Sequence, residues 1–316
     1  ETLFEGGELP GHLVVLGAGP IGMEMAQAFR RLGSEVTVLS HGSRTLEGDD
    51  EANAAIVQQA LEDEGVRFRL GEEPSALEPT DRGLRVVLES GAIEADRILY
   101  AIGRVANVED LQLPNAGLEV ERGALRVSGR CQTSHRHIYA AGDVTGRAQL
   151  THWAEHMGKT AITNAILKVP TWIDEGGLTW STFTDPAIAQ LGPTEQQLRE
   201  RDKRFETHEL PYELVDRAQA AADTRGQIRV HASRWGKILG VSIVGARADD
   251  LIGSWALAKK AGMRLSTISS VVHPYPTYGL GNRRAADQWF IRHFPAGLVR
   301  FYGRLLGYRG SIPKLT

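Results

Sequence analysis

Residues 12–39 constrain the fold of this chain more than any other segment. The apolar run Leu13–Leu16 predicts a buried strand, and residues 21–32 carry apolar side chains at helical spacing. Gly33 then ends the predicted helix, and Val36–Leu39 predicts a second strand. A strand, a helix and a strand in this order form a βαβ unit, so we expect a parallel sheet. The apolar face of the helix is expected to carry Ile21, Met25, Ala28, Phe29 and Leu32.

Three glycines at the first turn of this unit, Gly17, Gly19 and Gly22, have the G-x-G-x-x-G spacing. The first permits a tight turn, the second lets backbone approach a diphosphate, and the third lets the helix pack closely on the sheet. Pro20 and Ile21 begin the helix, where free N–H groups and the helix dipole favour an anion. The motif therefore predicts a dinucleotide site. The alternative is a glycine-rich turn that binds no ligand.

The end of the second predicted strand indicates which dinucleotide binds. A carboxylate there would accept hydrogen bonds from ribose hydroxyls and disfavour a 2′-phosphate. This chain instead has Ser40, His41 and Arg44, whose side chains suit a phosphate. We therefore expect NADPH rather than NADH. The alternative is that Ser40 accommodates either coenzyme and Arg44 is a solvated loop residue.

Composition excludes several other classes of protein. The 316 residues suffice for about two domains, and 42% hydrophobic residues support real cores. A net charge of −3 gives no reason to expect a nucleic-acid partner. Cys131 is the only cysteine, so the chain cannot form an internal disulfide or a two-cysteine redox centre. No run reaches the about 18 apolar residues of a spanning helix, and residues 1–5 do not resemble a secretory leader. We expect a cytoplasmic protein.

The pattern changes along the rest of the chain. Up to residue 167 it predicts further strands and helices, and beyond a Pro- and Gly-containing boundary at 169–177 short strands dominate. Strands and helices in such blocks predict an α+β second domain. The expected strands are 67–70, 84–88, 97–102, 138–141, 180–183, 188–191, 228–231 and 238–244, and the expected helices are 50–64, 153–167, 194–201 and 249–261.

Four ordered blocks resemble one family. They are Gly17–Ala26, Tyr100–Asn107, Ile138–Asp143 and Trp180–Gly192, of which the second contains Gly103 and has alanine where proline is usual. In this order they resemble the class I pyridine nucleotide-disulfide oxidoreductases, flavoproteins that include glutathione reductase, dihydrolipoamide dehydrogenase and mercuric reductase. The resemblance implies hydride transfer from NAD(P)H to FAD and on to a disulfide, a metal ion or another acceptor. The acceptor of this chain does not follow from its sequence.

The resemblance also implies three structural parts and a homodimer. Residues 1–105 would form a Rossmann-type α/β NAD(P)H-binding domain. Residues 106–172 would form the C-terminal part of an FAD-binding domain. Residues 173–316 would form an α+β dimerisation domain, through which two copies associate.

Flavin contacts implied by the resemblance lie around the third block. Asp143, after Gly142, would hydrogen-bond the ribityl chain of FAD, and Leu150 and Thr151 would pass near the pyrimidine end of the flavin. Gly103 would belong to the same cofactor-binding set. For Asp143 the alternative is an Asx turn or a helix cap.

Two residues are candidates for a catalytic role. Glu24 matches a family carboxylate that lies beside the nicotinamide; its alternative is a first-turn acid favoured by the helix dipole. Tyr275 stands where the family has histidine, and Leu280 where it has the orienting glutamate, so the acid–base pair for a dithiol is absent. A tyrosine there resembles mercuric reductase. The alternative is a residue that packs at an interface.

Family members begin with another G-x-G-x-x-G unit and a C-x-x-x-x-C pair, and neither is found in this sequence. We therefore expect a chain that lacks the N-terminal FAD-binding portion of its family. The alternatives are a non-catalytic dimeric NAD(P)-binding module and one half of a split flavoenzyme.

Two further segments have patterns that can bind ligands. His152 and His156 have i, i+4 spacing but no evident third ligand, so no metal site is expected. Residues 290–308 form a basic amphipathic stretch that could make weak membrane contact, or pack on the partner subunit or its own core. Its apolar residues are Phe294, Leu298, Val299, Phe301, Leu305 and Leu306. Its arginines are Arg292, Arg300 and Arg304, and Arg309 directly follows the stretch.

Overall fold

The computed structural model describes residues 7–81, 83–293 and 296–308. Its contacts divide the chain into two compact units, and each is described by itself. The first unit comprises residues up to 101 together with those from 181 onward, and the second comprises residues 102–180. The predicted division at 105 and 172 remains a prediction.

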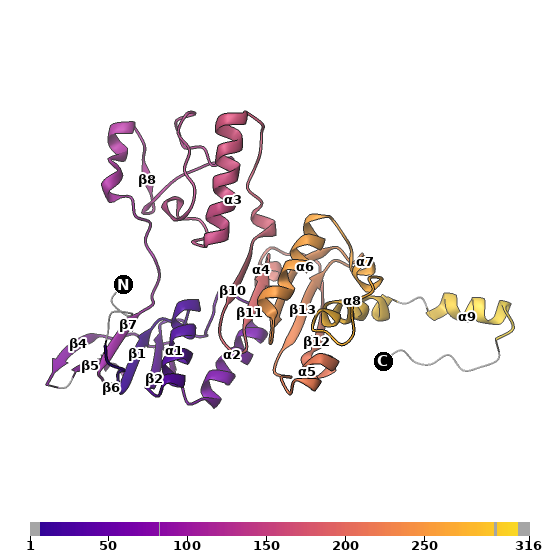
Figure 1. Cartoon of the computed structure of the whole chain (residues 1–316), viewed down its shortest axis with the longest axis horizontal. Coiled ribbons are helices and arrows are strands. Elements are labelled where there is room, and N and C mark those ends of the chain that lie inside the picture. Colours follow the sequence, from indigo (N-terminus) through magenta and orange to yellow (C-terminus); the bar gives the residue numbers. More distant parts are fainter. Residues whose placement is uncertain (1–6, 82, 294–295, 309–316) are drawn as a thin grey trace. The chain divides into compact units, whose positions relative to one another are not determined.

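A four-stranded parallel sheet organises the N-terminal part of the first unit (Figure 1). β1 pairs in parallel with β2 on one side and β7 on the other, and β2 pairs with β3. This arrangement confirms the predicted βαβ unit and parallel sheet. The elements are β1 (His12–Leu16), α1 (Pro20–Leu32), β2 (Glu35–Ser40), α2 (Glu51–Asp63), β3 (Arg67–Leu70) and β7 (Arg97–Tyr100).

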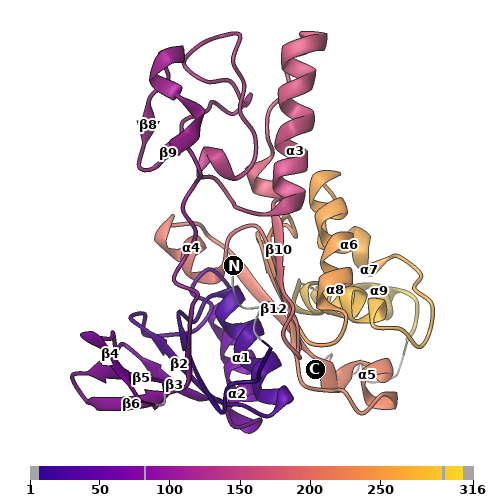
Figure 2. The ribbon, with the colours of Figure 1, turned by 60° about the vertical axis from the view of Figure 1, so that its left-hand side comes forward.

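The two faces of the parallel sheet are covered differently. One carries α1 and α2, whose buried side chains pack with β1 and β2. The other carries an antiparallel sheet of β4 (Ala76–Thr80), β5 (Gly83–Leu88) and β6 (Gly91–Ala95), seen beside the parallel strands in Figure 2. Val86 and Leu88 of β5 pack on Val14 and Leu16 of β1. The central strands β1 and β2 are therefore buried on both sides, as their apolar sequence requires, whereas the edge strands β3 and β7 are partly exposed.

The buried face of α1 differs from the expected one. Gly22, Met23, Ala26 and Gln27 are its buried residues, whereas Ile21 and Leu32 are exposed, so this prediction was wrong. A Cβ at position 22 would overlap the carbonyl oxygen of Gly17. Close approach of backbone at Gly22 turns that side of the helix toward the strand, and helical periodicity alone does not reveal it.

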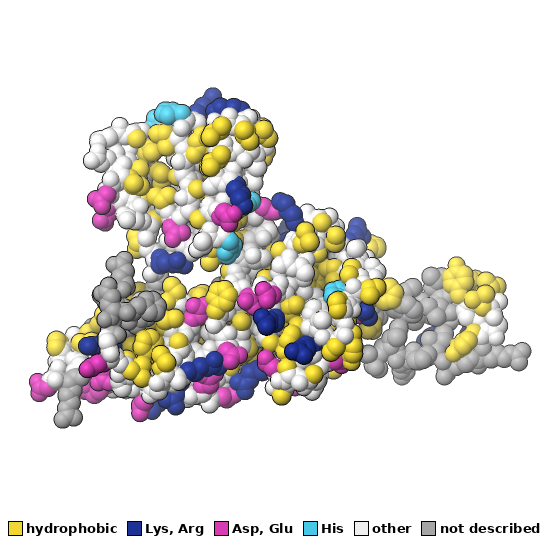
Figure 3. Space-filling model, viewed as in Figure 1, with side chains coloured by type: hydrophobic (Ala, Val, Ile, Leu, Met, Phe, Trp, Pro, Cys, Tyr) yellow, Lys and Arg dark blue, Asp and Glu magenta, His cyan; other side chains and the backbone are white. Residues whose placement is uncertain are grey.

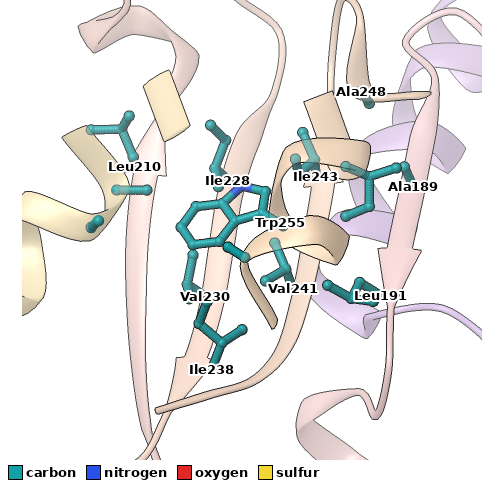
Figure 4. Close-up of a cluster of buried hydrophobic side chains, with 14 of the residues drawn as sticks. Ala189, Leu191, Leu210, Ile228, Val230, Ile238, Val241, Ile243, Ala248 and Trp255 are labelled. Atoms are coloured by element: carbon teal, nitrogen blue, oxygen red, sulfur yellow. The ribbon is translucent and has the colours of Figure 1, made fainter. Parts of the chain in front are cut away.

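An antiparallel sheet in the order β10-β11-β14-β13-β12 forms the core of the C-terminal part of the first unit. Trp255 of α6 is 1% exposed and packs on Ile228, Val230 and Ile243 (Figure 4). The α+β prediction is confirmed. The elements are β10 (Thr179–Thr182), β11 (Ile188–Leu191), α4 (Glu195–Glu200), β12 (Glu206–Pro211), α5 (Asp216–Ala220), β13 (Gln227–Ala232), β14 (Ile238–Val244), α6 (Ala248–Lys260), α7 (Leu265–Ser269), α8 (Gly279–His293) and α9 (Ala296–Leu305).

The second unit has little regular structure apart from one helix, α3 (Thr151–Ile162), which continues as a π-helical turn, Thr163–Leu167. A short hairpin joins β8 (Val120–Glu121) and β9 (Ala124–Leu125). The strand expected at 138–141 is wrong. Only an isolated bridge between Gln132 and Tyr139 forms there, because Ile138 instead closes a turn onto Thr133.

His208 on β12 gives a prediction about pH. Its side chain is 1% exposed. Burial, together with the charge of Arg292, lowers the pKa of His208 from 6.5 to about 4. Between these pH values the unfolded chain binds a proton at His208 and the folded chain does not. The free energy of unfolding therefore decreases as the pH falls from about 6.5 toward 4. We expect a loss of up to about 3 kcal/mol from this residue.

Urea unfolding of the native chain and of His208→Gln at several pH values tests this prediction. The variant should show a flatter dependence on pH between these limits. Equal slopes for both chains would contradict it.

Within the described ranges, no helix is both long and apolar enough to cross a lipid bilayer.

Candidate nucleotide-binding site

The three glycines after β1 serve different needs in the structure. Gly17 has φ of 109° and donates its N–H to the carbonyl oxygen of Leu39 at 2.7 Å. Gly22 is required by the close approach of α1 to the strand end. Gly19 has φ of −79°, and a Cβ there would meet nothing within 4 Å. The fold therefore explains two glycines but not Gly19, whose missing side chain leaves open space before the helix.

The N-terminus of α1 is suited to an anion. Gly19 is the N-cap residue, no side chain caps the helix, and Pro20 occupies the first turn. The first turn also carries no acidic residue. The N–H groups and the positive end of the dipole at Ile21 and Gly22 are therefore available to a diphosphate.

The segment after β2 is a closed loop. Ser40 is half-buried, and its Oγ accepts the N–H of Gly42 at 3.3 Å. The His41 side chain is 76% exposed, with Nδ1 3.9 Å from Glu73. Arg44 is half-buried and donates to the carbonyl oxygens of residues 45, 46, 47 and 49. Arg44 is thus a loop-closing residue rather than a solvated one, and contact with a phosphate would draw it from these carbonyls.

Glu47 is a residue of this site that the sequence analysis missed. Its carboxylate lies where a Cβ at Gly42 would stand, on the same side as the Ser40 hydroxyl. The sequence did not indicate Glu47, because it lies several residues after the end of β2, whereas the usual position for a ribose-binding acid is the strand end itself.

Glu24 has a structural partner. It is the fifth residue of α1, beyond the first turn, so the first-turn alternative is wrong. Its carboxylate accepts the backbone N–H of Phe183 at 2.7 Å. Gln27 bonds both the N–H and the carbonyl of Asp185, and Arg31 pairs with the carboxylate of Asp185 at 2.8 Å. One side of α1 is therefore fixed to the turn at 183–185.

The residues expected to contact flavin lie in the second unit. Gly142 has φ of 81° and is the N-cap of the short 3-10 turn that begins at the exposed Asp143, so Asp143 is not the capping residue. Leu150 is half-buried and precedes α3, whose first residue is the exposed Thr151. Gly103 has φ of 133° and open space where a Cβ would be. An exposed carboxylate beside a buried glycine suits the hydroxyls of a ribityl chain.

Tyr275 lies in the loop between α7 and α8 and is 71% exposed. Val272, in the same loop, is 91% exposed. The neighbouring His273 directs Nδ1 to the carbonyl of Val271 at 3.1 Å. The loop therefore presents Tyr275, Val271 and Val272 outward.

Both histidines of the i, i+4 pair are engaged with backbone. His152 Nε2 lies 2.7 Å from the carbonyl of Thr179, and His156 Nε2 accepts the N–H of Asp174 at 3.2 Å. Across the parts of the chain that the structure describes, no three His, Cys, Asp or Glu residues gather to hold a metal ion.

A buried ionic cluster at the start of α2 was not foreseen. Arg229 of β13 binds Asp50, the N-cap of α2, and also Glu195 at 2.7 Å and Glu209 at 2.9 Å. His231 Nε2 lies 3.4 Å from the second oxygen of Asp50. Burial favours a raised pKa for Asp50, but bonds and charges from His231 and Arg229 outweigh it and lower the pKa. The cluster joins the helix layer of the parallel sheet to the antiparallel sheet.

A parallel sheet whose first turn carries the three glycines is thus combined with an antiparallel α+β part. Residues 2–158 match the model of the pyridine nucleotide-disulphide oxidoreductases, and residues 178–284 match the dimerisation domain of the same family. The chain belongs to this family. Enzymes of the family use NAD(P)H and FAD.

Curated relatives agree with this assignment. The chain is 34% identical over 294 residues to a dihydrolipoyl dehydrogenase of Thermus scotoductus, covering 88% of this chain and 62% of that protein. It is 35% identical over 291 residues to a mercuric reductase of Lysinibacillus sphaericus, covering 90% and 53%. The chain thus spans less than two thirds of the length of these relatives.

Solved structures share the fold. LpdA of Mycobacterium tuberculosis superposes with a TM-score of 0.85 at 27% identity, covering 90% of this chain and 63% of that one. The Cu(II) complex of RclA, an HOCl-induced flavoprotein disulfide reductase of Escherichia coli, gives 0.84 at 28% identity, covering 90% and 65%.

Proposed function

We propose that this chain acts in an NAD(P)H:acceptor oxidoreductase, in which it binds the reduced nicotinamide coenzyme and contributes part of the FAD site. The observation that carries the proposal is Gly19. Nothing in the packing of the protein requires glycine there, and its missing side chain leaves the helix N-terminus open to a diphosphate.

The residues of α1 have separate tasks in this proposal. Backbone N–H groups at Ile21 and Gly22 hold the diphosphate, while Gly17 keeps the turn tight. Glu24 would border the nicotinamide, and its bond to Phe183 would fix its orientation. When bound, NAD(P)H and FAD supply the hydride donor and acceptor, and the protein positions them.

For FAD, the exposed Asp143 would accept hydrogen bonds from ribityl hydroxyls, with Gly142 allowing close approach. Leu150, Thr151 and Gly103 complete the proposed contacts. The match to the dimerisation domain supports a homodimer, in which the exposed Tyr275 would face the partner.

Anaerobic addition of NADPH to the purified chain supplied with FAD tests the function. Bleaching of the flavin absorbance supports an oxidoreductase. Nucleotide binding without flavin reduction supports the alternative of a non-catalytic dimeric module. Bleaching only after addition of a chain that carries the family's N-terminal portion supports one half of a split flavoenzyme.

Coenzyme choice gives a prediction at Glu47. Ser40 and His41 favour the 2′-phosphate of NADPH, whereas the carboxylate of Glu47 beside Ser40 repels it. We expect Glu47→Gln to tighten NADPH relative to NADH by about 5-fold, since one exposed charge contributes about 1 kcal/mol. Titration of both coenzymes measures the ratio, with Glu119→Gln, an exposed glutamate of the second unit, as the matched control. An unchanged ratio in Glu47→Gln would refute the role given to this carboxylate.

A further inference from the structure

The C-terminal segment lies outside the family's dimerisation domain. The match to that domain ends at residue 284, within α8, and α9 follows it at Ala296–Leu305. The function of α9 therefore does not follow from the family.

Charge is distributed unevenly between this segment and the rest of the chain. Residues 288–316 contain five Lys or Arg residues and no Asp or Glu. Since the whole chain has a net charge of −3, residues 1–287 carry −8. A cationic segment on an otherwise acidic protein has the sign required to bind an anionic surface.

The side chains of α9 separate into two faces. Phe301 and Leu305, one turn apart, are 62% and 70% exposed, and the adjacent Tyr302 is exposed as well. Arg300 and Arg304, also one turn apart, border this apolar face. Hydrophobic side chains of α9 are visible at the right of the space-filling view (Figure 3). Phe294 and Arg309, which the sequence analysis placed in or directly after the basic amphipathic stretch, lie outside the described residues, as do the side chains of Leu298 and Val299.

The exposed apolar face of α9 could be covered by the core of the same chain, by a second copy or by a lipid bilayer. The core of the same chain does not cover it, because the described apolar side chains of α9 remain exposed. Two copies of the segment cannot pair with each other through opposite charges, because it contains no Asp or Glu, and the segment lies beyond the matched dimerisation domain. An anionic bilayer satisfies both faces at once, since aromatic and leucine side chains enter the interface while arginines stay at the headgroups.

We propose that α9 binds the surface of anionic lipid membranes, lying in the interface plane. A ten-residue helix is about 15 Å long, too short to span a hydrocarbon core of about 30 Å. Phe301 and Leu305 would enter the headgroup–acyl boundary, and Arg300 and Arg304 would contact lipid phosphates. The proposal does not depend on the coenzyme or on the proposed reaction.

Flotation of the full chain with phosphatidylcholine vesicles, with and without phosphatidylserine, tests the proposal. We expect binding only to the anionic vesicles. Replacing both arginines, Arg300→Glu and Arg304→Glu, should weaken it by about 30-fold, and Phe301→Ser with Leu305→Ser should abolish it. Arg201→Glu and Leu32→Ser, exposed residues outside the segment, are the matched controls and should bind as the native chain does.

Three results would overturn the proposal. The first is absence of binding to anionic vesicles, and the second is binding that the α9 variants do not weaken. The third is a lipid-free dimer that becomes monomeric in Phe301→Ser with Leu305→Ser, which would assign the apolar face to a second copy. Unchanged thermal unfolding of the variants verifies that the rest of the protein remains folded.

Discussion

Replacing Gly19 by glutamate is expected to raise the Kd for NADPH and NADH at least about 100-fold while the protein remains folded. The backbone at Gly19 has φ of −79°, which any residue adopts, and a Cβ there meets no neighbour within 4 Å. The new carboxylate would occupy the diphosphate position and add repulsion at the helix N-terminus. Loss of a charge-assisted diphosphate contact and the added repulsion together exceed about 3 kcal/mol.

Gly22→Ala is the comparison variant, and its main expected effect is a loss of stability. A Cβ at Gly22 overlaps the Gly17 carbonyl, so α1 must shift from β1. We expect the free energy of unfolding to fall by about 2–3 kcal/mol. Urea unfolding and nucleotide titration of both variants separate the effects. Native affinity in Gly19→Glu would show that the diphosphate does not bind at this turn.

Arg229→Met is expected to lower the free energy of unfolding by about 3–5 kcal/mol. The substitution leaves Asp50 buried, with 0% side-chain exposure, and removes one partner of Glu195 and the partner of Glu209. A buried carboxylate without its counter-charge is strongly destabilising, because its desolvation is no longer offset. His231, 3.4 Å from Asp50, is the remaining neighbour that can offset part of this cost.

Two controls identify the buried charge as the cause. Arg199→Ala removes an exposed arginine that pairs with Glu195 four residues earlier, and should change stability by no more than about 0.5 kcal/mol. Adding Asp50→Asn to Arg229→Met should recover part of the loss, because the orphaned charge is removed. Equal stability of Arg229→Met and Arg199→Ala would contradict this account of the cluster.

The sequence predicted the parts of the fold that local patterns determine. The strand-turn-helix-strand order from Leu13 to Leu39 follows from apolar runs ended by Gly17 and Gly33, and the structure contains it. The α+β character of the C-terminal part was also predicted. The face of α1 was not, because it depends on contact between the Gly22 backbone and the Gly17 carbonyl, which periodicity does not encode.

Features built from distant residues could not be foreseen. Asp50 and Arg229 are 179 positions apart, and neither has a local pattern that marks it as buried. Glu24 was singled out by its place after the glycines, but its bond to Phe183 depends on tertiary packing. The structure thus adds partners to residues that the motif had only located.

Calorimetric titration of the native chain with NADPH and with NADH tests the central claim most directly. We predict saturable one-site binding of at least one coenzyme, with a Kd between about 1 μM and 1 mM, the usual range for enzyme substrates. A folded sample that retains neither coenzyme at millimolar concentration would contradict the assignment of the open helix N-terminus to a nicotinamide diphosphate.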